Sequence, residues 1–174
     1  DKSIIISEDR YNVFQEIKKI KIDKNANFDT IILGTEISNS IFTQPGYNSS
    51  HSGGHLEGPK NKPQKLWSKD IGKGINKEFP IMTNLIGHNQ LIFVMDTGGK
   101  LSALEQNNGN LIWQKELGNR ENSYSASAGG IALDNNAIYA HLGGFDIFTL
   151  DIVTGNQIWK NTLEYPIVSG PVIS

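Results

Sequence analysis

The sequence predicts an all-β fold built from repeated four-stranded units. Two observations support this prediction: a tryptophan that recurs at a constant interval, and short apolar runs separated by turn residues. Trp67, Trp113 and Trp159 lie 46 residues apart in both intervals (113 − 67 and 159 − 113). The stretches around the last two are near-copies, QNNGNLIWQKEL at 106–117 and IVTGNQIWKNTL at 152–163. A constant period of this length is typical of a structural repeat.

The register of the repeat extends beyond the tryptophans. At the same offset, apolar residues match apolar residues, glycines match glycines and an acid matches an acid. The matched pairs are Ile92 and Ile138, Phe93 and Tyr139, Gly98 and Gly144, Leu101 and Ile147, Leu104 and Leu150, Glu105 and Asp151, Gly109 and Gly155, Ile112 and Ile158, and Leu117 and Leu163. Because the alignment needs no gap, we expect one structural unit in each period.

Each unit contains four short apolar runs, which we interpret as strands. In the first unit they are separated by residues 88–89, 97–99 and 107–110, where Gly and Asn supply the φ > 0 positions that hairpins require. The expected strands are 80–87, 90–96, 100–106 and 111–117 in the first unit, and 127–133, 137–142, 146–151 and 157–163 in the second. Four antiparallel strands in one such period correspond to one blade of a β-propeller.

A single strand is expected on each side of the two blades. Residues 65–71 resemble the last strand of a preceding unit, and residues 165–174 the first strand of a following one. Two blades cannot close a ring, so we expect an incomplete propeller that is part of a longer protein. We divide the chain into an N-terminal extension and loop leading into the propeller, residues 1–64, and the repeat blades, residues 65–174.

The extension shows no repeat. Residues 7–20 fit a short amphipathic helix or an extended strand, and residues 29–33 a strand. Residues 44–64 are rich in Gly, Pro, Ser and Asn and are typical of a long loop.

The composition narrows the function classes. A net charge of −2 and a pI of about 6.1 give no basic field for nucleic acid. The absence of cysteine excludes disulfides and thiolate chemistry within the chain. No apolar run approaches the ~20 residues that span a bilayer, and residues 1–10 do not form a signal peptide. The protein is therefore cytosolic, or its targeting segment has been removed.

We interpret the repeated tryptophans as packing residues between neighbouring blades, because a constant period suits architecture better than a cofactor platform. Gly109 and Gly155 are expected in turns that need φ > 0. The sequence SAGG at 127–130 is typical of a strand beside another backbone near the propeller centre. Asp96 and Asp134 precede turns and are expected to cap them with hydrogen bonds to backbone N–H groups.

The sequence assigns no catalytic, cofactor-binding or metal-binding residue. His51 and His55 have the i, i+4 spacing of a metal pair, but the two intervening glycines disfavour a helix and no third ligand is evident. His88 and His141 are interpreted as an ordinary turn residue and strand residue. No set of Ser, His and Asp has a spacing that indicates nucleophilic catalysis.

The repeat resembles the PQQ-type repeat. Its motif G-N-x-I-W follows LSALE at 101–105 and FTLD at 148–151, similar to Ala/Thr-Leu-Asp/Glu-x-x-Thr/Asn-Gly-x-x-Ile-Trp. This repeat builds the eight-bladed propellers of quinoprotein dehydrogenases and of the non-enzymatic BamB-type outer-membrane assembly lipoproteins. Residues 42–56 followed by 66–74 resemble the entry of alphaproteobacterial BamB-like proteins, in which Gln-x-Gly-x-Asn-x-x-His leads into the first Trp strand.

The BamB resemblance implies a non-enzymatic periplasmic scaffold, associated with the outer membrane through a lipid anchor that lies outside this chain. Its implied partners are the periplasmic domains of BamA and unfolded outer-membrane proteins, with no cofactor. The resemblance does not identify the residues that contact these partners. Open blade edges also suggest self-association.

Two alternatives stay open. The first is a fragment of a PQQ-dependent dehydrogenase, for which the resemblance implies a vicinal disulfide, a calcium site and a catalytic Asp. The chain has no cysteine and no Asp-x-Asp-x-Asp loop, which weakens that reading. The second is a sensor domain that binds peptides or polysaccharide.

Overall fold

The computed structural model describes residues 23–25, 32–38, 41–73, 84–118, 129–167 and 169–174. The chain divides into two units, 1–33 and 34–174, and both sheets belong to the second. The segment expected at 7–20 and most of that at 29–33 lie outside the described residues. The described residues contain no helix of the length and apolarity that crossing a membrane requires.

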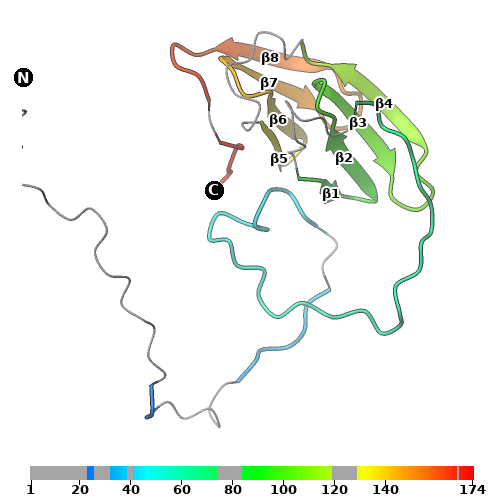
Figure 1. Ribbon diagram of the computed structural model, residues 1–174, viewed down its shortest axis with the longest axis vertical. Coiled ribbons are helices and arrows are strands. Elements are labelled where there is room, and N and C mark those ends of the chain that lie inside the picture. The colour runs from blue at the N-terminus through cyan, green and yellow to red at the C-terminus, as the bar shows by residue number, and fades with distance from the viewer. Residues whose placement is uncertain (1–22, 26–31, 39–40, 74–83, 119–128, 168) are drawn as a thin grey trace, which may run out of the picture. The chain divides into compact units, whose positions relative to one another are not determined.

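The fold is all-β, with two four-stranded antiparallel sheets that lie side by side (Figure 1). Each sheet follows chain order, β1-β2-β3-β4 and β5-β6-β7-β8. The strands are β1 (Ile86–His88), β2 (Leu91–Met95), β3 (Lys100–Glu105), β4 (Leu111–Glu116), β5 (Gly130–Asp134), β6 (Ala137–His141), β7 (Asp146–Asp151) and β8 (Gln157–Thr162). The prediction of two four-stranded units is confirmed, and most strands begin or end within a few residues of the expected positions. The strand expected at 80–87 is shorter: residues 84 and 85 are not part of β1, and residues 80–83 lie outside the described residues.

The two sheets repeat one another down to the register of their strands. Lys100 pairs with Glu116 in the first sheet, and Asp146 pairs with Thr162 at the equivalent place in the second. A register shift after Ala103 recurs after Thr149. Such a bulge bends the strand before the tight turn that follows. The sequence repeat is therefore a repeat of backbone geometry.

A single apolar core lies between the sheets. Alternate residues of the strands β1 to β7 face it, as the period of two along a strand requires, whereas β8 contributes none. Its buried members are Ile86, Phe93, Met95, Leu101, Ala103, Trp113 and Leu117 from the first sheet and its C-terminal flank, and Ile131, Leu133, Ile138, Ala140, Leu142, Phe148, Leu150 and Ile152 from the second sheet and the turns beside it.

Trp113 of β4 contacts the turn between β7 and β8 and so connects the first sheet to the second. Its Nε1 donates a hydrogen bond of 2.9 Å to the carbonyl oxygen of Ile152. The indole lies so close to Gly155 that a Cβ at this glycine would be 2.5 Å from Cδ2 of the ring. Gly155 also has a φ of +67°, which favours glycine. The turn therefore requires glycine both for its backbone conformation and for the space that the indole fills.

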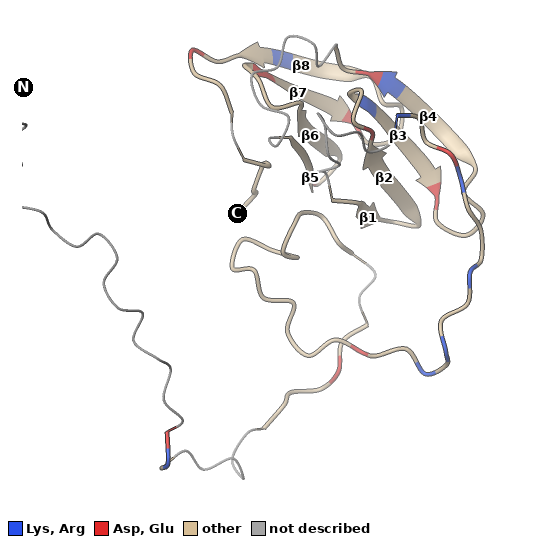
Figure 2. Cartoon of the chain, in the orientation of Figure 1, with Lys and Arg blue, Asp and Glu red and all other residues tan. Residues whose placement is uncertain are grey.

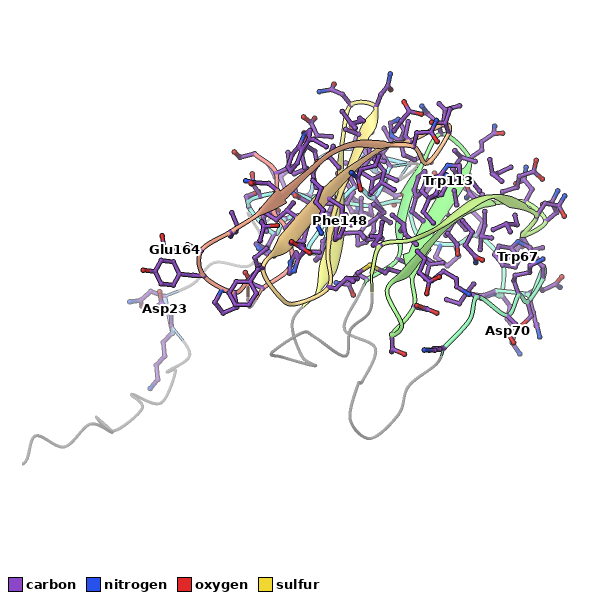
Figure 3. The ribbon with its side chains drawn as sticks, turned by 90° about the horizontal axis from the view of Figure 1, so that it is seen from above. Asp23, Trp67, Asp70, Trp113, Phe148 and Glu164 are labelled. Atoms are coloured by element: carbon purple, nitrogen blue, oxygen red, sulfur yellow. The ribbon has the colours of Figure 1, made fainter. Side chains whose placement is uncertain are left out.

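Trp67 makes the same contact with the turn between β3 and β4. Its Nε1 donates to the carbonyl oxygen of Gln106 at 2.8 Å, and a Cβ at Gly109 would lie 2.6 Å from Cε3 of the ring. Figure 3 labels Trp113 on the first sheet and Trp67 on the segment that precedes it. Residues 65–71 were expected to form a strand, but they join no ladder. A ladder needs a neighbouring strand to pair with, and the described residues offer none there, whereas the indole contact needs only the following sheet.

Residues 42–44 tie the inner edges of the two sheets together. Phe42 exchanges both backbone hydrogen bonds with Gly87 of β1, at 2.7 and 2.8 Å. The carbonyl oxygen of Thr43 accepts from the N–H of Leu133 in β5 at 2.8 Å. The buried amide oxygen of Gln44 accepts from the N–H of Ile173 at 2.7 Å. The inner edges are thus already hydrogen-bonded.

The C-terminal segment packs on the second sheet without forming the strand expected at 165–174. The N–H of Ile167 donates to the carbonyl oxygen of Gly144 at 2.8 Å. A Cβ at Gly130 would lie 2.8 Å from the Cα of Gly170, which confirms the close backbone approach predicted for residues 127–130 at its last glycine.

Asp146 joins three side chains across β7 and β8. Its carboxylate lies 2.7 Å from Nζ of Lys160 and accepts a hydrogen bond of 2.6 Å from Oγ1 of Thr162. The hydrogen bond from Lys160 and then that from Thr162 lower the pKa of Asp146 below 3.8, against the opposing effect of partial burial. Nζ of Lys160 also lies 5.1 Å from the centre of the Phe148 ring. The network fixes the end of the outer strand.

Single substitutions of Trp113 and Trp159 compare the stability contribution of a buried tryptophan with that of an exposed one. Trp113 is 8% exposed, whereas Trp159 is 41% exposed and meets the ring of Tyr139 edge-on, with 6.1 Å between the ring centres. We expect Trp113→Ala to lower the free energy of unfolding by about 3–5 kcal/mol, as for a buried aromatic residue, and Trp159→Ala by less than half of that. Urea unfolding followed by circular dichroism measures both. Equal losses would contradict the assignment of Trp113 as an inter-sheet lock.

The Asp146 network predicts a pH-dependent contribution to stability. Because folding lowers the pKa of this carboxyl, its contribution is present above the unfolded value of 3.8 and is lost as the pH falls through the lower folded value. The side chain is partly exposed, so we expect Asp146→Asn to cost only about 0.5 kcal/mol at neutral pH. In denaturant titrations this difference should shrink below pH 3.8. The control Glu164→Gln changes an exposed carboxylate without an ion pair among the described residues, and a similar profile for both variants would contradict the prediction.

Candidate interaction surface

The outer strands, β4 and β8, each leave one edge unpaired among the described residues. Leu111 and Ile112 on β4 and Ile158 on β8 are about half exposed. An unpaired edge presents a row of backbone N–H and C=O groups to an added strand. Since residues 42 and 43 already hydrogen-bond the inner edges, the outer edges are where these sheets can accept another strand.

β8 has little protection against strand addition. Every one of its residues is exposed, and its one charged side chain is Lys160. Charged residues on an edge strand, lysine above all, normally discourage pairing. Here the ammonium group of Lys160 is paired with Asp146 inside the sheet. Figure 2 shows how few charges lie along this strand. The side chains of β8 are therefore more exposed than those of β4 in this chain.

Polar side chains hold the turns beside these strands in fixed shapes. Oδ1 of Asp151 accepts hydrogen bonds from the N–H groups of Val153 and Thr154, at 3.1 and 2.7 Å, and from Oγ1 of Thr154 at 2.7 Å. The side-chain bond from Thr154, followed by its backbone bond, lowers the pKa of Asp151. In the first sheet Glu105 occupies the same place and accepts from Nδ2 of Asn110 at 3.1 Å.

Asp96 caps its turn as the sequence predicts. Its Oδ1 accepts from the N–H groups of Gly98 and Lys100, at 2.9 and 2.8 Å, and its Oδ2 accepts from the N–H of Lys73 at 2.8 Å. The last bond was not predicted, and it fixes the segment that carries Trp67. Asp134 differs, because among the described residues its carboxylate accepts from the side-chain Nδ2 of Asn135, at 3.0 Å, and not from a backbone group.

Hydrogen bonds within the Gln-x-Gly-x-Asn-x-x-His element shape it into a loop, while Gln44 ties it to Ile173. Oδ1 of Asn48 accepts from the N–H groups of Ser50 and Ser52, both at 3.1 Å, and from Oγ of Ser50 at 2.8 Å. Gly46 has a φ of +78°, and a Cβ there would overlap the ring of His51. Asn48, Gly46 and His51 of this element therefore shape the loop.

His51, His55 and His141 have different neighbours and do not form a common site. Nδ1 of His55 lies 2.7 Å from the carbonyl oxygen of Gly34, whereas the His51 ring packs on Gly46. Nδ1 of His141 accepts from the N–H of Gly143, so its Nε2 carries the proton and donates to the carbonyl oxygen of Ser169 at 2.6 Å. Within the described ranges, no three His, Asp or Glu side chains are grouped so that they could hold a metal ion.

Sequence reasoning missed two features of this surface. One is the contact of each glycine turn with a tryptophan of the preceding repeat, although a constant spacing of 42 residues (109 − 67 and 155 − 113) marks it. The other is His88 at the end of β1, whose Nδ1 is buried and has no hydrogen-bond partner in the part of the chain that the structure describes. No sequence signal indicates it, because its burial depends on the loop at 43–49.

Comparison with known proteins places the repeat in one family. The family model for outer membrane protein assembly factor BamB matches residues 61–172. The BamB of Salmonella typhimurium is 24% identical over 116 residues, covering 64% of this chain and 29% of that protein. The BamB of Moranella endobia is 29% identical over 126 residues, and the match covers 66% of this chain and 32% of the Moranella protein. The chain spans about a third or less of these relatives.

A solved structure supports the fold. The quinohemoprotein alcohol dehydrogenase of Comamonas testosteroni superimposes with a TM-score of 0.55 at 15% identity, covering 78% of this chain and 22% of that one. Identity at this level shows a shared propeller-type fold and nothing about activity. The BamB family model, by contrast, spans both four-stranded sheets and Trp67. The chain therefore belongs to the BamB family of outer membrane protein assembly factors.

Proposed function

We propose that the chain is part of a non-enzymatic periplasmic scaffold that assists the assembly of outer-membrane β-barrels. Its proposed partners are the periplasmic domains of BamA and unfolded outer-membrane proteins. Membership of the BamB family supports the assembly role. The relatives are named as assembly factors, and the scaffold role extends that name to this chain.

The observation that carries this proposal is the contrast between the two kinds of sheet edge. The inner edges are occupied by residues 42 and 43, whereas the outer edges of β4 and β8 have no partner strand among the described residues. A rigid sheet with an open edge can add an extended segment by β-augmentation, in which backbone hydrogen bonds give affinity and side-chain contacts give specificity. Unfolded barrel proteins supply such segments, because their sequences must form strands.

Exposed apolar side chains on the outer strands favour a segment with apolar residues. Ile112 and Ile158 occupy equivalent places on β4 and β8 and are both exposed. Side chains at matching places on adjacent antiparallel strands interact directly, which contributes about 0.2–1 kcal/mol for each pair. The same edges would also support pairing between two copies of the chain.

A lysine substitution on β8 tests whether its edge binds the proposed partners. We expect Ile158→Lys to weaken binding of the chain to purified BamA periplasmic domains or to an unfolded barrel protein, because an edge lysine must be desolvated on pairing. Biolayer interferometry measures the affinity, with light scattering as a check for self-association. The control Val153→Lys makes the same exchange at an exposed turn residue off the strand. Equal binding by both variants would remove β8 from the interface.

The alternative is a fragment of a PQQ-dependent dehydrogenase. It rests on the resemblance of the repeat to the PQQ-type repeat, and the quinohemoprotein alcohol dehydrogenase of Comamonas testosteroni shares the fold. An optical titration of the chain with pyrroloquinoline quinone and calcium separates the two proposals. A saturable change of the quinone spectrum supports the dehydrogenase, and an unchanged spectrum together with partner binding supports the scaffold.

A further inference from the structure

We propose that a cavity at the inner ends of the two sheets binds a neutral saccharide. The cavity lies between the loop at 43–49, the end of β1 and the turn between β5 and β6, and it measures about 440 Å³. Small-molecule sites generally measure ~300–1,000 Å³. The volume therefore suits a small ligand such as one or two sugar rings.

The walls combine apolar surface with uncharged hydrogen-bonding groups. Leu133 and Ile173 supply the apolar part, and the aromatic ring of Tyr47 is also in the lining. Ser49 adds a hydroxyl group to the same lining, whereas the amides of Asn48 and Asn135 already make hydrogen bonds within the protein. A sugar ring needs both kinds of contact, because its C–H groups are apolar while its hydroxyls must keep hydrogen bonds on leaving water.

The charges of the cavity disfavour anionic ligands. The lining contains no lysine or arginine, and its one charged side chain is the carboxylate of Asp134. Residues 37–56, which include the loop, carry no charged side chain at all, as the uniform colour of this loop in Figure 2 shows. A phosphate or a polyanion would find no cation here. A ligand that donates hydrogen bonds from hydroxyls matches a lone carboxylate.

The carboxylate of Asp134 has unused hydrogen-bonding capacity. It accepts one hydrogen bond among the described residues, from Nδ2 of Asn135, although a carboxylate can accept about four. Ligand hydroxyls would donate to its free positions. Nδ1 of His88 has no partner among the described residues, but it is too deeply buried for water or a ligand hydroxyl to reach it from the cavity.

The backbone around the cavity is held in an unusual conformation. Tyr47 has a φ of +79° and Asn135 a φ of +50°. Asparagine tolerates this region, but for a bulky residue such as tyrosine it is rare. Two contacts lie beside Tyr47 in this loop. Asn48 hydrogen-bonds to Ser50, and the ring of Phe42 lies 6.5 Å from the ring of Tyr47. Such strain is concentrated at binding sites, where it fixes a side chain in advance of the ligand.

An extended peptide does not suit this cavity. The backbone groups that a peptide would pair with are engaged, since Gly87 of β1 bonds to Phe42 and the N–H of Leu133 in β5 bonds to Thr43. This site is therefore separate from the open outer edges of β4 and β8, and its test does not depend on partner binding there.

Saturation-transfer-difference NMR on the full chain with cellobiose and N,N′-diacetylchitobiose tests the site. We expect saturation transfer to at least one disaccharide, weakened about tenfold by Tyr47→Gly and by Asp134→Ala, since each removes one contact of the sugar. Glycine tolerates the φ of residue 47, so this variant should retain its fold, as tryptophan fluorescence can verify. The control Asn107→Ala changes an exposed amide outside the lining and should bind as the parent chain does.

Two results would overturn the proposal. One is the absence of saturation transfer from the chain to either disaccharide, or transfer that all three variants leave unchanged. The other is binding of an alternating Val-Thr hexapeptide that Tyr47→Gly abolishes while neither sugar binds, which would assign the cavity to peptides.

Discussion

The contact between an indole and a glycine turn is the interaction on which this structure depends. Trp67 and Trp113 each reach across to the following sheet, donate a hydrogen bond to a turn carbonyl, and fill the space that a side chain on Gly109 or Gly155 would occupy. A four-stranded sheet has two faces to cover, and a repeat that contacts only its neighbours must carry the same covering residue in every unit. The tryptophans therefore recur at a constant spacing in the sequence.

This stacking decides which surfaces stay available. The facing sides of the two sheets are buried in the core between them, and residues 42 and 43 hydrogen-bond to the inner edges. The outer strands keep one free edge each, and the turns next to them are made rigid by short polar bonds such as those of Asp151. A surface that is rigid in shape and incomplete in its hydrogen bonding is suited to a scaffold, because a partner strand loses its own freedom but meets a sheet that is already ordered.

Much of the fold could be predicted from the sequence, because its signals are local. Glycine at 109 and 155 marks left-handed turns, and alternating apolar residues mark strands such as β7. The absence of a ladder at 65–71 could not be predicted, since pairing depends on a second strand and not on the segment itself. The same holds for the surface: the exposed edge of β8 follows from what lies beside it, and the unpaired nitrogen of His88 follows from the packing of a distant loop. Repeat motifs report architecture, whereas binding surfaces arise from contacts that no motif encodes.

A double-mutant cycle on Trp113 and Gly155 tests the central contact most directly. In the parent chain, Gly155→Ala should cost about 2 kcal/mol or more, from the left-handed backbone and from overlap with the indole. With Trp113→Leu in place, the overlap is relieved, and the cost of Gly155→Ala should fall by about 1 kcal/mol. The comparison variant Gly58→Ala, at a glycine with open space around it, should behave the same in both backgrounds. If the two substitutions at 113 and 155 are simply additive in urea unfolding, the indole does not hold the turn and the account of the repeat is wrong.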